Sequence, residues 1–393
     1  MTFKVANIIS AFKSKSGGPP RTVALIAAAG LGTWSTELFT TSFQESPADT
    51  LLIDDYPGPV NVLPDQCHGM LGGLAMWAGF NRSFRTQLRR GAPHLIHIHG
   101  MWDPYLAAFA DEARRLEVPY IVAPHGMLEP WSMSVRSVRK MLALKSYQGT
   151  LLTHAAAIHA TSELEADNLR RLINARTPVF IVPNCVEPPP SAVTKPSPPR
   201  GEKKVLLFLS RIHEKKGLDI LLRAWNDLRP ADWRLLIVGS GEAEYLAQLA
   251  RFCASNAVPD VEFKSHVEGA EREDVFARAS AFVLPTYSEN FGNVIAEALI
   301  RGLPVITTTG TPWSDIVAHE CGWYIEPTLD ELRTTLAAVV ATDPQTLQRM
   351  GERGRKYATD HFSLSVVRRA LLQMYQSVMP SSPNRYASFE GLQ

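Results

Sequence analysis

Cysteine is scarce in this chain, and no two cysteines stand close enough to form a C-x-x-C pair. The four are Cys67, Cys185, Cys253 and Cys321 of 393 residues. This pattern indicates neither a disulfide framework nor a cysteine zinc site, and a reducing compartment is the natural expectation.

Long apolar runs are missing as well. Val23–Gly32 is too short and too rich in small residues to span a bilayer, and no signal-peptide core precedes Gly17. We therefore expect a cytoplasmic protein, with peripheral contact at the inner membrane face left open.

An excess of one charge is also absent, since 40 Lys and Arg oppose 39 Asp and Glu, for a net charge of +1. No zinc-finger or aromatic-rich RNA-binding signature accompanies these charges. Nucleic acid is therefore not an expected partner.

What the sequence does contain is a regular alternation of strand-like and helix-like segments, which is typical of parallel sheets covered on both faces. Strands are predicted at 3–10, 51–54, 95–99, 120–123, 156–160, 179–182, 205–209, 233–238, 261–263, 281–284 and 305–309. Helices are predicted at 21–29, 105–116, 163–173, 218–228, 242–256, 271–278, 293–301, 329–341, 344–357 and 364–378. A proline-rich linker at 188–200 divides this α/β chain into Rossmann-like domains at 1–187 and 201–361.

The most informative stretch is residues 280–304. A short apolar strand precedes a loop with Glu289, and a helix follows whose first backbone N–H groups favour a phosphate. Those amides belong to Asn290, Phe291, Gly292 and Asn293. Glu297, one turn into the helix, could accept hydrogen bonds from the vicinal hydroxyls of a ribose. Spacing alone equally allows a surface acid at 297 and a capping residue at 289.

A further loop of the second half could hold a diphosphate. Arg211 and Lys216 follow the strand 205–209, where side chains emerge at the carboxyl edge of a parallel sheet. Each charge-assisted bond to a phosphate contributes roughly 1.5 to 3 kcal/mol. The alternative is a solvated basic loop. Gly239 follows the next predicted strand, 233–238, in a glycine turn that opens a helix.

Candidate residues in the first half are fewer. Gly17 and Gly18 lie between a strand and a helix, a possible cradle for an anion or a sugar, although structural glycine turns are common. His125 follows a strand, where a neutral imidazole could bind a sugar hydroxyl or have a structural role. His97 and His99 share one strand face and could ligate a metal, but no third ligand stands at a suitable spacing, so packing is favoured.

A basic, amphipathic stretch at 133–145 could meet an anionic lipid headgroup or an acceptor diphosphate. The alternative is an ordinary solvated helix face.

Glu289-Asn-Phe-Gly292, followed by Glu297-Ala-Leu and Gly302-Leu-Pro-Val305, resembles the E-x7-E signature of family 4 retaining glycosyltransferases. Such group 1 glycosyl transferases of polysaccharide biosynthesis have the GT-B fold. The resemblance implies two Rossmann-like domains whose parallel sheets face a central cleft. The acceptor would be bound by 1–187, the nucleotide-sugar by 201–361, and the terminal helix 362–380 would pack back on the first domain.

The resemblance also implies roles for the candidates. Catalysis would use Glu289, His125, Lys216 and Arg211; donor binding would use Gly17, Gly18, Gly239, Val267, Asn290, Phe291, Gly292, Asn293 and Glu297. No metal or other cofactor is expected, because the two cations and the helix-start amides can stabilise the departing diphosphate.

The implied reaction moves a hexose, with retention, from a UDP-sugar to an acceptor in exopolysaccharide or other glycan biosynthesis. UDP-glucose is the donor expected from its frequency in the family, and the acceptor would be a saccharide or a polyprenyl-diphosphate-linked saccharide. An epimerase or hydrolase on the same fold, or a catalytically inactive nucleotide-sugar-binding subunit, remains an alternative.

Overall fold

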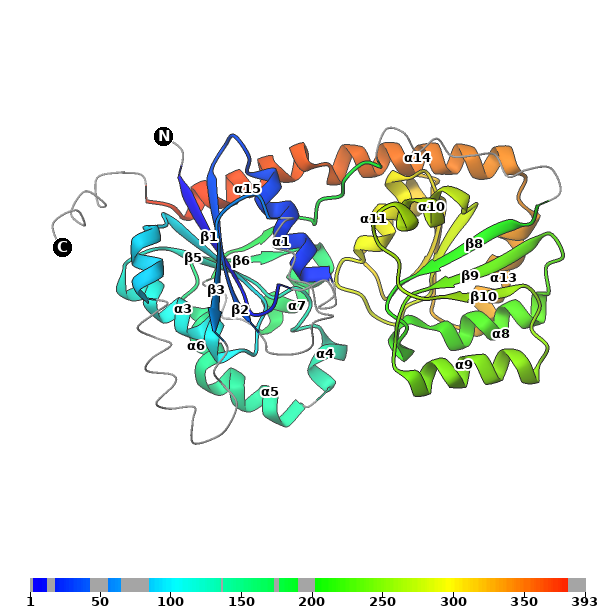
Figure 1. Cartoon of the computed structure of the whole chain (residues 1–393), viewed down its shortest axis with the longest axis horizontal. Coiled ribbons are helices and arrows are strands. Elements are labelled where there is room, and N and C mark those ends of the chain that lie inside the picture. Colours follow the sequence, from blue (N-terminus) through cyan, green and yellow to red (C-terminus); the bar gives the residue numbers. More distant parts are fainter. Residues whose placement is uncertain are drawn as a thin grey trace. The chain divides into compact units, whose positions relative to one another are not determined.

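A computed structural model describes residues 3–12, 18–42, 56–64, 85–135, 137–172, 177–189 and 202–380. The chain divides into two compact units (Figure 1). The N-terminal unit comprises Met1–Val182 and Val367–Gln393, and the C-terminal unit comprises Pro183–Val366. The units thus divide between residues 182 and 183 and between 366 and 367, a few residues from the expected positions at 187 and 361. Residues 190–201, with most of the expected linker, lie outside the described residues.

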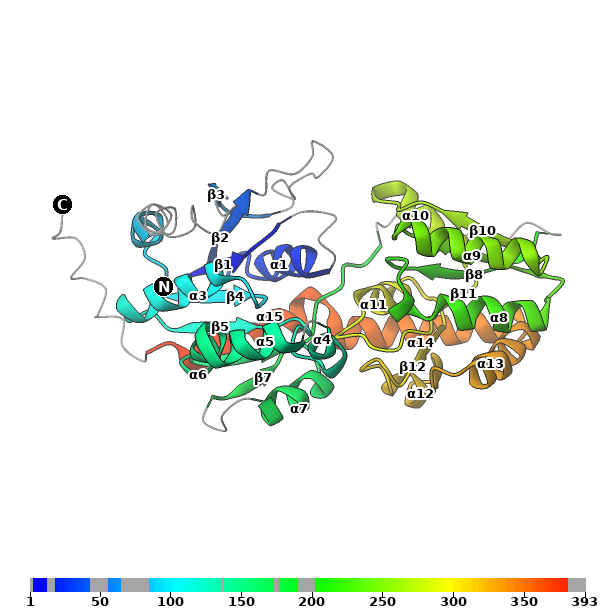
Figure 2. The same ribbon diagram turned by 90° about the horizontal axis from the view of Figure 1, so that it is seen from below.

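The N-terminal unit is built on a parallel sheet with the order β3-β2-β1-β4-β5-β6-β7, which Figure 2 shows from β3 at the top to β7 at the bottom. Its strands are β1 (Lys4–Ile9), β2 (Ser35–Ser42), β3 (Val60–Pro64), β4 (Leu95–His99), β5 (Tyr120–Ala123), β6 (Ala157–Ala160) and β7 (Val179–Ile181). β4 and β5 have the predicted bounds, whereas β2 and β3 were not predicted. The predicted strand 51–54 lies outside the described residues.

Helices cover this sheet. They are α1 (Gly18–Ala29), α3 (Pro104–Arg115), α4 (Pro130–Ser134), α5 (Ser137–Ala143), the π-helix η2 (Leu144–Gln148), α6 (Gly149–Thr153), α7 (Glu163–Leu172) and most of α15 (Leu364–Val378). The prediction that α1 begins at Arg21 is wrong. The helix begins at Gly18, because Pro19 and Pro20 are tolerated in a first turn, where N–H groups have no intrahelical acceptor.

Strand β4 shows why both faces of the sheet are buried. Ile96 and Ile98 join the apolar cluster that contains α3, whereas His97 and His99 alternate onto the opposite face. On that face the terminal helix α15 inserts Tyr375, whose ring packs edge-on against Phe3 and Trp34 and whose hydroxyl lies 2.9 Å from His97 Nδ1.

The C-terminal unit has a parallel sheet with the order β10-β9-β8-β11-β12-β13. Its strands are β8 (Lys204–Leu209), β9 (Trp233–Val238), β10 (Val261–Lys264), β11 (Ala281–Leu284), β12 (Val305–Thr308) and β13 (Gly322–Ile325). The helices are the 3-10 helix η3 (Glu214–Lys216), α8 (Leu218–Leu228), α9 (Ala243–Ser255), α10 (Gly269–Arg278), α11 (Asn293–Ile300), α12 (Asp315–Ala318), α13 (Leu329–Ala341) and α14 (Pro344–Phe362).

In Figure 1, α8 and α9 lie on one face of this sheet, and α10, α11 and α14 lie on the other. The buried strands are nearly continuous apolar runs, such as Ala-Phe-Val-Leu in β11, as expected for strands covered on both faces. The predicted α/β fold with two Rossmann-like, parallel-sheet domains is therefore confirmed.

Candidate active site

The strand order of the C-terminal sheet changes direction between β8 and β11. The chain runs outward from β8 through β9 to β10, and then returns to the other side of β8 to start β11. In open parallel sheets, ligands bind beyond the carboxyl ends of the strands at such a reversal. The two loops that leave the sheet there carry Lys216 and Glu289.

Lys216 and Glu289 form an ion pair between Lys216 Nζ and Glu289 Oε2. The two side chains are 10% and 20% exposed, so the pair is largely shielded but still reachable from solvent. The loops themselves are joined through the backbone, since Tyr287 N donates to Lys215 O at 2.9 Å. The sequence predicted both residues as catalytic, and the structure brings them into contact, which their spacing of 73 residues did not predict.

Two glycines allow these loops to approach so closely. Gly217 has φ +68°, and a Cβ there would lie 2.1 Å from the carbonyl oxygen of Pro285. Gly239 has φ +154°, and a Cβ there would lie 1.9 Å from Ser210 O. Both positions therefore require glycine for loop packing. At position 239 this packing alone explains the glycine, and no bound nucleotide is needed to explain it.

The Glu289 loop leads into α11. Gly292 precedes the helix in the left-handed region, with φ +78°. Phe291 is buried against Trp313, with 5.2 Å between ring centroids, and the Trp313 indole N–H donates to the Phe291 carbonyl. The Asn293 amide oxygen accepts from Asn184 Nδ2 at 2.7 Å. The start of α11 is thus fixed by packing on several sides.

Arg211 and Val267 occupy contrasting environments. Arg211 follows β8, is exposed, and makes no ion pair within the described ranges. Val267 follows β10 and is buried, at 2% exposure, so only its backbone could serve a ligand.

Glu297 lies on α11 and is 7% exposed. Its carboxylate pairs with Arg272 of α10, a residue that the sequence did not identify. Arg301 pairs in turn with Glu273, and both guanidinium groups lie over the ring of Phe276, at 5.5 and 4.8 Å from its centroid. The paired carboxylate of Glu297 retains lone pairs for hydroxyl donors, so the contact leaves ribose binding open.

In the N-terminal unit, His125 and Gly126 both have positive φ, +51° and +73°. The turn is held by Glu165 of α7, whose Oε1 accepts the Gly126 N–H at 2.7 Å and whose Oε2 accepts the Thr161 N–H at 2.8 Å. The Gly126 N–H is thus already bound within the protein. The capping-box spacing Ser162-x-x-Glu165 is the sequence signal that could have pointed to Glu165.

His97 and His99 belong to a cluster with His125 and His159. His159 Nδ1 lies 3.2 Å from His97 Nε2, and His99 Nδ1 lies 3.1 Å from His125 Nε2. His97 and His99 are fully buried, so both side chains are packed inside the unit, as the sequence favoured. Within the described part of the chain, no group of three histidine, cysteine or acidic side chains could hold a metal ion.

Burial keeps this cluster neutral. It lowers the pKa of His125 to about 3 and the pKa of His159 to about 4. It also holds the pKa values of His97 and His99 well below the usual range for histidine, with further depression from the neighbouring rings.

Of the predicted glycine cradle, Gly17 lies outside the described residues. Gly18 is exposed as the first residue of α1.

Comparison with known proteins gives matches in both halves of the chain. Residues 17–185 match the model described as "Glycosyl transferase 4-like domain", and residues 203–342 match "Glycosyl transferases group 1". The chain is similar to the capsular polysaccharide biosynthesis glycosyltransferase CapM of Staphylococcus aureus, with 27% identity over 46% of this chain and 48% of CapM. It thus spans about half the length of that relative. It is also similar to the phosphatidyl-myo-inositol mannosyltransferase of Mycobacterium leprae, with 25% identity over 81% of this chain and 83% of that protein.

Among solved structures, HepE of Anabaena in complex with UDP and glucose resembles this chain with a TM-score of 0.76. The match covers 95% of this chain and 100% of HepE at 19% identity, so the likeness concerns the fold.

Two parallel-sheet α/β units, together with the likeness to HepE, define the GT-B fold class for this chain. The chain belongs to the group 1 glycosyltransferases, since the two family models together match most of its length.

Proposed function

We propose that the chain is a retaining, metal-independent hexosyltransferase that uses a UDP-sugar donor. The observation that carries this proposal is the Lys216–Glu289 pair at the strand reversal of the C-terminal sheet. It joins a cation suited to a phosphate with a carboxylate suited to a sugar.

The chemistry follows from the donor, which carries its own leaving group. As the sugar departs, negative charge grows on the diphosphate. Arg211, Lys216 and the first amides of α11 would stabilise that charge, so no cofactor is needed. Glu289 would bind sugar hydroxyls and steady the positive anomeric carbon, and Glu297 would bind the ribose. His125 would contact an outer hydroxyl of the transferred sugar.

UDP-glucose is the proposed donor. It is supported by the presence of UDP and glucose in the HepE complex. The proposed acceptor is a saccharide or a polyprenyl-diphosphate-linked saccharide, in exopolysaccharide or other glycan biosynthesis in the cytoplasm. The similarity to CapM, a glycosyltransferase of capsular polysaccharide biosynthesis, supports this proposal.

Isothermal titration with UDP tests the donor site directly. We expect saturable heat below millimolar UDP, because the cations and helix amides around Lys216 are retained in the folded chain. A screen of UDP- and GDP-sugars for slow hydrolysis then identifies the donor. Absence of heat at millimolar UDP would contradict the proposal, and complete turnover of a donor without any acceptor would favour a hydrolase or epimerase instead.

We further propose that α4 and α5 form a surface for anionic lipid. Five large apolar side chains gather there in exposed positions: Trp131, Val135, Val138, Met141 and Leu142. Val138 is 72% exposed and Leu142 is 64% exposed. Within the predicted stretch 133–145, Met133 and Leu144 pack against the core of the unit, whereas the exposed Trp131 lies just before that stretch.

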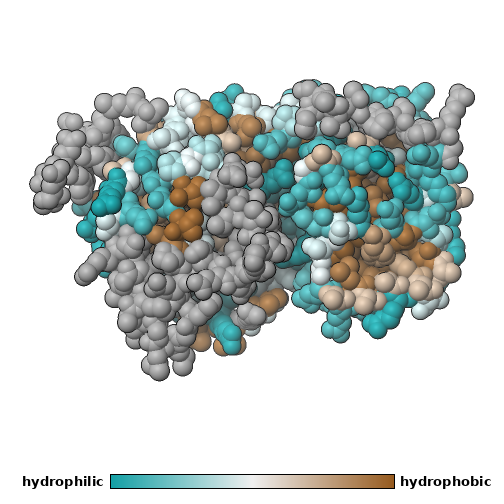
Figure 3. Space-filling view, in the orientation of Figure 1, coloured by the Kyte–Doolittle hydropathy of each residue, from teal (hydrophilic) through white to brown (hydrophobic). Residues whose placement is uncertain are grey.

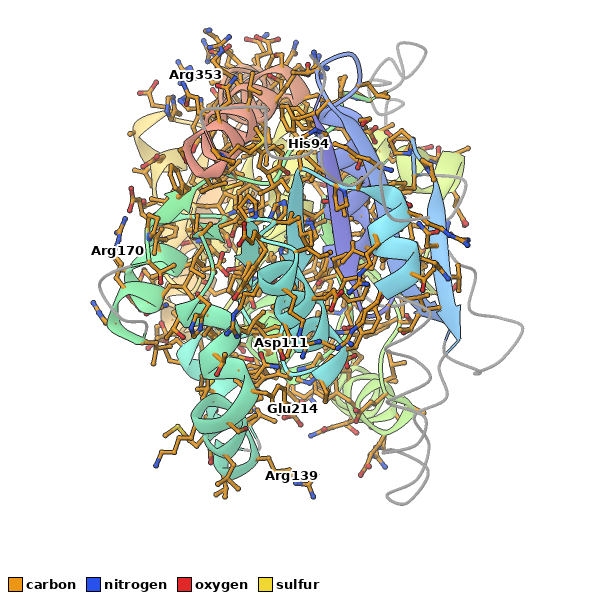
Figure 4. The ribbon with its side chains drawn as sticks, turned by 90° about the vertical axis from the view of Figure 1, so that its left-hand side faces the viewer. His94, Asp111, Arg139, Arg170, Glu214 and Arg353 are labelled. Atoms are coloured by element: carbon orange, nitrogen blue, oxygen red, sulfur yellow. The ribbon has the colours of Figure 1, made fainter. Side chains whose placement is uncertain are left out.

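Basic side chains accompany the apolar ones. Arg139 points outward from α5 in Figure 4, and Lys145 is exposed in η2. Lys140 is tied to Ser132 O at 2.5 Å, and Arg136 lies outside the described residues. In Figure 3, a few hydrophobic and hydrophilic residues lie next to one another where the lower edge of the N-terminal unit is not drawn in grey. Apolar insertion with adjacent positive charge is the chemistry that binds an anionic bilayer surface. No helix of the described residues is both long and apolar enough to cross a membrane.

Sedimentation with vesicles tests this surface. Replacing Val138 and Leu142 together by serine is expected to weaken partition into phosphatidylglycerol vesicles at least tenfold, since each buried CH2 contributes about 0.8 kcal/mol. The control is Val317→Ser, which removes another exposed valine, 54% exposed, from α12 of the other unit. Equal binding by all variants, or equal binding to uncharged phosphatidylcholine vesicles, would refute the proposal.

A further inference from the structure

A chain of hydrogen bonds runs from the centre of the N-terminal sheet to His125. Asn7 of β1 places Oδ1 3.0 Å from His99 Nε2, and His99 Nδ1 lies 3.1 Å from His125 Nε2. Asn7 and His99 are each 1% exposed. They lie on β1 and β4, the two strands between which the order of this sheet reverses.

The direction of this chain is set at its buried end. The Asn7 amide nitrogen lies 2.8 Å from Thr36 Oγ1 and 2.9 Å from Tyr56 OH, and these two hydroxyls lie 2.5 Å from each other. Three contacts in a triangle need three protons. An amide NH2 supplies two and one hydroxyl supplies the third.

The opposite orientation of the Asn7 amide would supply too few protons for the three contacts. With the Asn7 oxygen facing the hydroxyls, each would spend its only proton on that oxygen. The short contact between Thr36 and Tyr56 would then contain no proton. The triangle therefore directs the Asn7 oxygen toward His99.

The tautomers of both histidines follow. His99 must carry its proton on Nε2 to donate to Asn7, so its Nδ1 accepts. His125 must then carry its proton on Nε2 to donate to His99. This leaves His125 Nδ1 as an acceptor, and it has no hydrogen-bond partner among the residues that the structure describes.

The second branch of the cluster offers no proton that could alter this pattern. His159 Nε2 donates to the carbonyl of Val182 at 2.8 Å, so its Nδ1 accepts from His97 Nε2, and His97 Nδ1 accepts from the hydroxyl of Tyr375. The ionisable groups around His99 are thus His97, His125 and His159, all held neutral by burial, with Tyr56 and Tyr375 as phenols whose pKa is raised by burial.

We propose that Asn7 and His99 are positioning residues that present His125 to the substrate as a hydrogen-bond acceptor at Nδ1. The group recognised there is a donor hydroxyl of a sugar, because a phosphate or carboxylate oxygen would face a lone pair. The strained turn at His125 and Gly126, clamped by Glu165, holds the ring in place. This inference rests on the proposed function for the identity of the ligand, but the tautomer does not depend on any ligand.

Long-range 1H–15N spectra of protein labelled at histidine nitrogens test the tautomer without substrate, with His125 assigned by comparison with His125→Gln. We expect an Nε2-protonated, neutral ring at His125 at pH 7. A proton on Nδ1 in the unaltered protein would overturn the inference, whether or not the chain transfers a sugar.

Two variants at one position test the positioning role. In His99→Gln the amide NH2 can donate to Asn7 and the amide oxygen can accept from His125, so tautomer and kcat/KM should stay within about twofold of wild type. His99→Leu removes both bonds. Its His125 should lose the fixed tautomer, and its kcat/KM should fall about 10- to 100-fold, as when a supporting hydrogen bond is removed.

The outcomes separate the two proposals. If wild type shows the expected tautomer but binds no nucleotide-sugar, the proposed function fails and the tautomer stands. If His99→Gln loses activity while its melting temperature and His125 tautomer are unchanged, the positioning role is wrong. Should His99→Leu fail to fold, the wild-type spectrum and the His99→Gln rates still decide the matter.

Discussion

Replacing Lys216 by alanine is expected to lower the rate of sugar transfer by roughly 100- to 1000-fold, the usual effect of removing one group that stabilises transition-state charge. Lys216 holds a fixed position because η3, Gly217 and the end of β11 are packed together. Its charge would therefore be in place before the diphosphate departs, without reorganisation. The measurement is kcat and kcat/KM with the donor found by the hydrolysis screen.

Glu289→Ala is expected to lose transfer to a similar extent, because the same pair would lose the carboxylate that is proposed to bind the sugar. Neither change should move the melting temperature appreciably, since the surviving partner of a pair that is 10% and 20% exposed can be hydrated. The double variant should lose little beyond the worse single one, as is usual for groups that act as a unit.

Lys215→Ala is the matched control. Lys215 precedes Lys216 on the same 3-10 helix, and what the site takes from it is its backbone carbonyl, which accepts from Tyr287 N and Thr286 Oγ1. That carbonyl is retained in alanine, so transfer should stay near wild type. Wild-type turnover in Lys216→Ala or Glu289→Ala, or an equal loss in Lys215→Ala, would show that the assigned site is wrong.

The parts of the fold that could be predicted are those whose local pattern decides the structure. The helix Leu218–Leu228 and the strand Ala281–Leu284 have the predicted bounds, because an apolar stripe or a short apolar run identifies them. Strand β2, Ser-Thr-Glu-Leu-Phe-Thr-Thr-Ser, was missed because half of its buried positions are hydroxyl residues. Thr40 is fully buried there, which only the neighbouring strands explain.

The candidate site likewise has features that the sequence could predict and features that it could not. Glu289 and Lys216 could be placed at strand ends from sequence, because each follows an apolar strand of a parallel sheet. Their contact could not be predicted, since it depends on β8 and β11 being neighbours. The same holds for Arg272 with Glu297 and for Asn7 with His99, which meet only once helices and strands are arranged in space.

Acidification is expected to unfold the N-terminal unit long before the C-terminal one. His97, His99 and His159 are at most 1% exposed, and burial depresses the pKa of each in the folded state. In the unfolded chain these rings bind protons below about pH 6.5. The unfolded state thus binds more protons as the pH falls from 6.5 toward 4, so stability is lost across that window.

The expected loss in free energy of unfolding is large enough to unfold the N-terminal unit first. At pH 5, about 1.5 units below the unfolded pKa, each fully buried neutral histidine lowers the free energy of unfolding by up to about 2 kcal/mol. Three of them lower it by about 6 kcal/mol, comparable with the whole stability of many domains, about 5 to 15 kcal/mol.

Amide hydrogen exchange, corrected for the intrinsic pH dependence of the rates, measures this effect unit by unit. Peptides covering β4 and β6 should lose several kcal/mol of opening free energy between pH 7 and pH 5. Peptides covering β8 and β11 serve as the internal control, because the C-terminal sheet contains no histidine.

His159→Gln keeps a donor for Val182 O and an acceptor for His97, and it removes one titrating ring. It should therefore reduce the pH dependence of the opening free energy of β4 by about a third. Equal behaviour of the two sheets, or an unchanged slope in His159→Gln, would mean that the buried histidines do not control the acid stability of this unit.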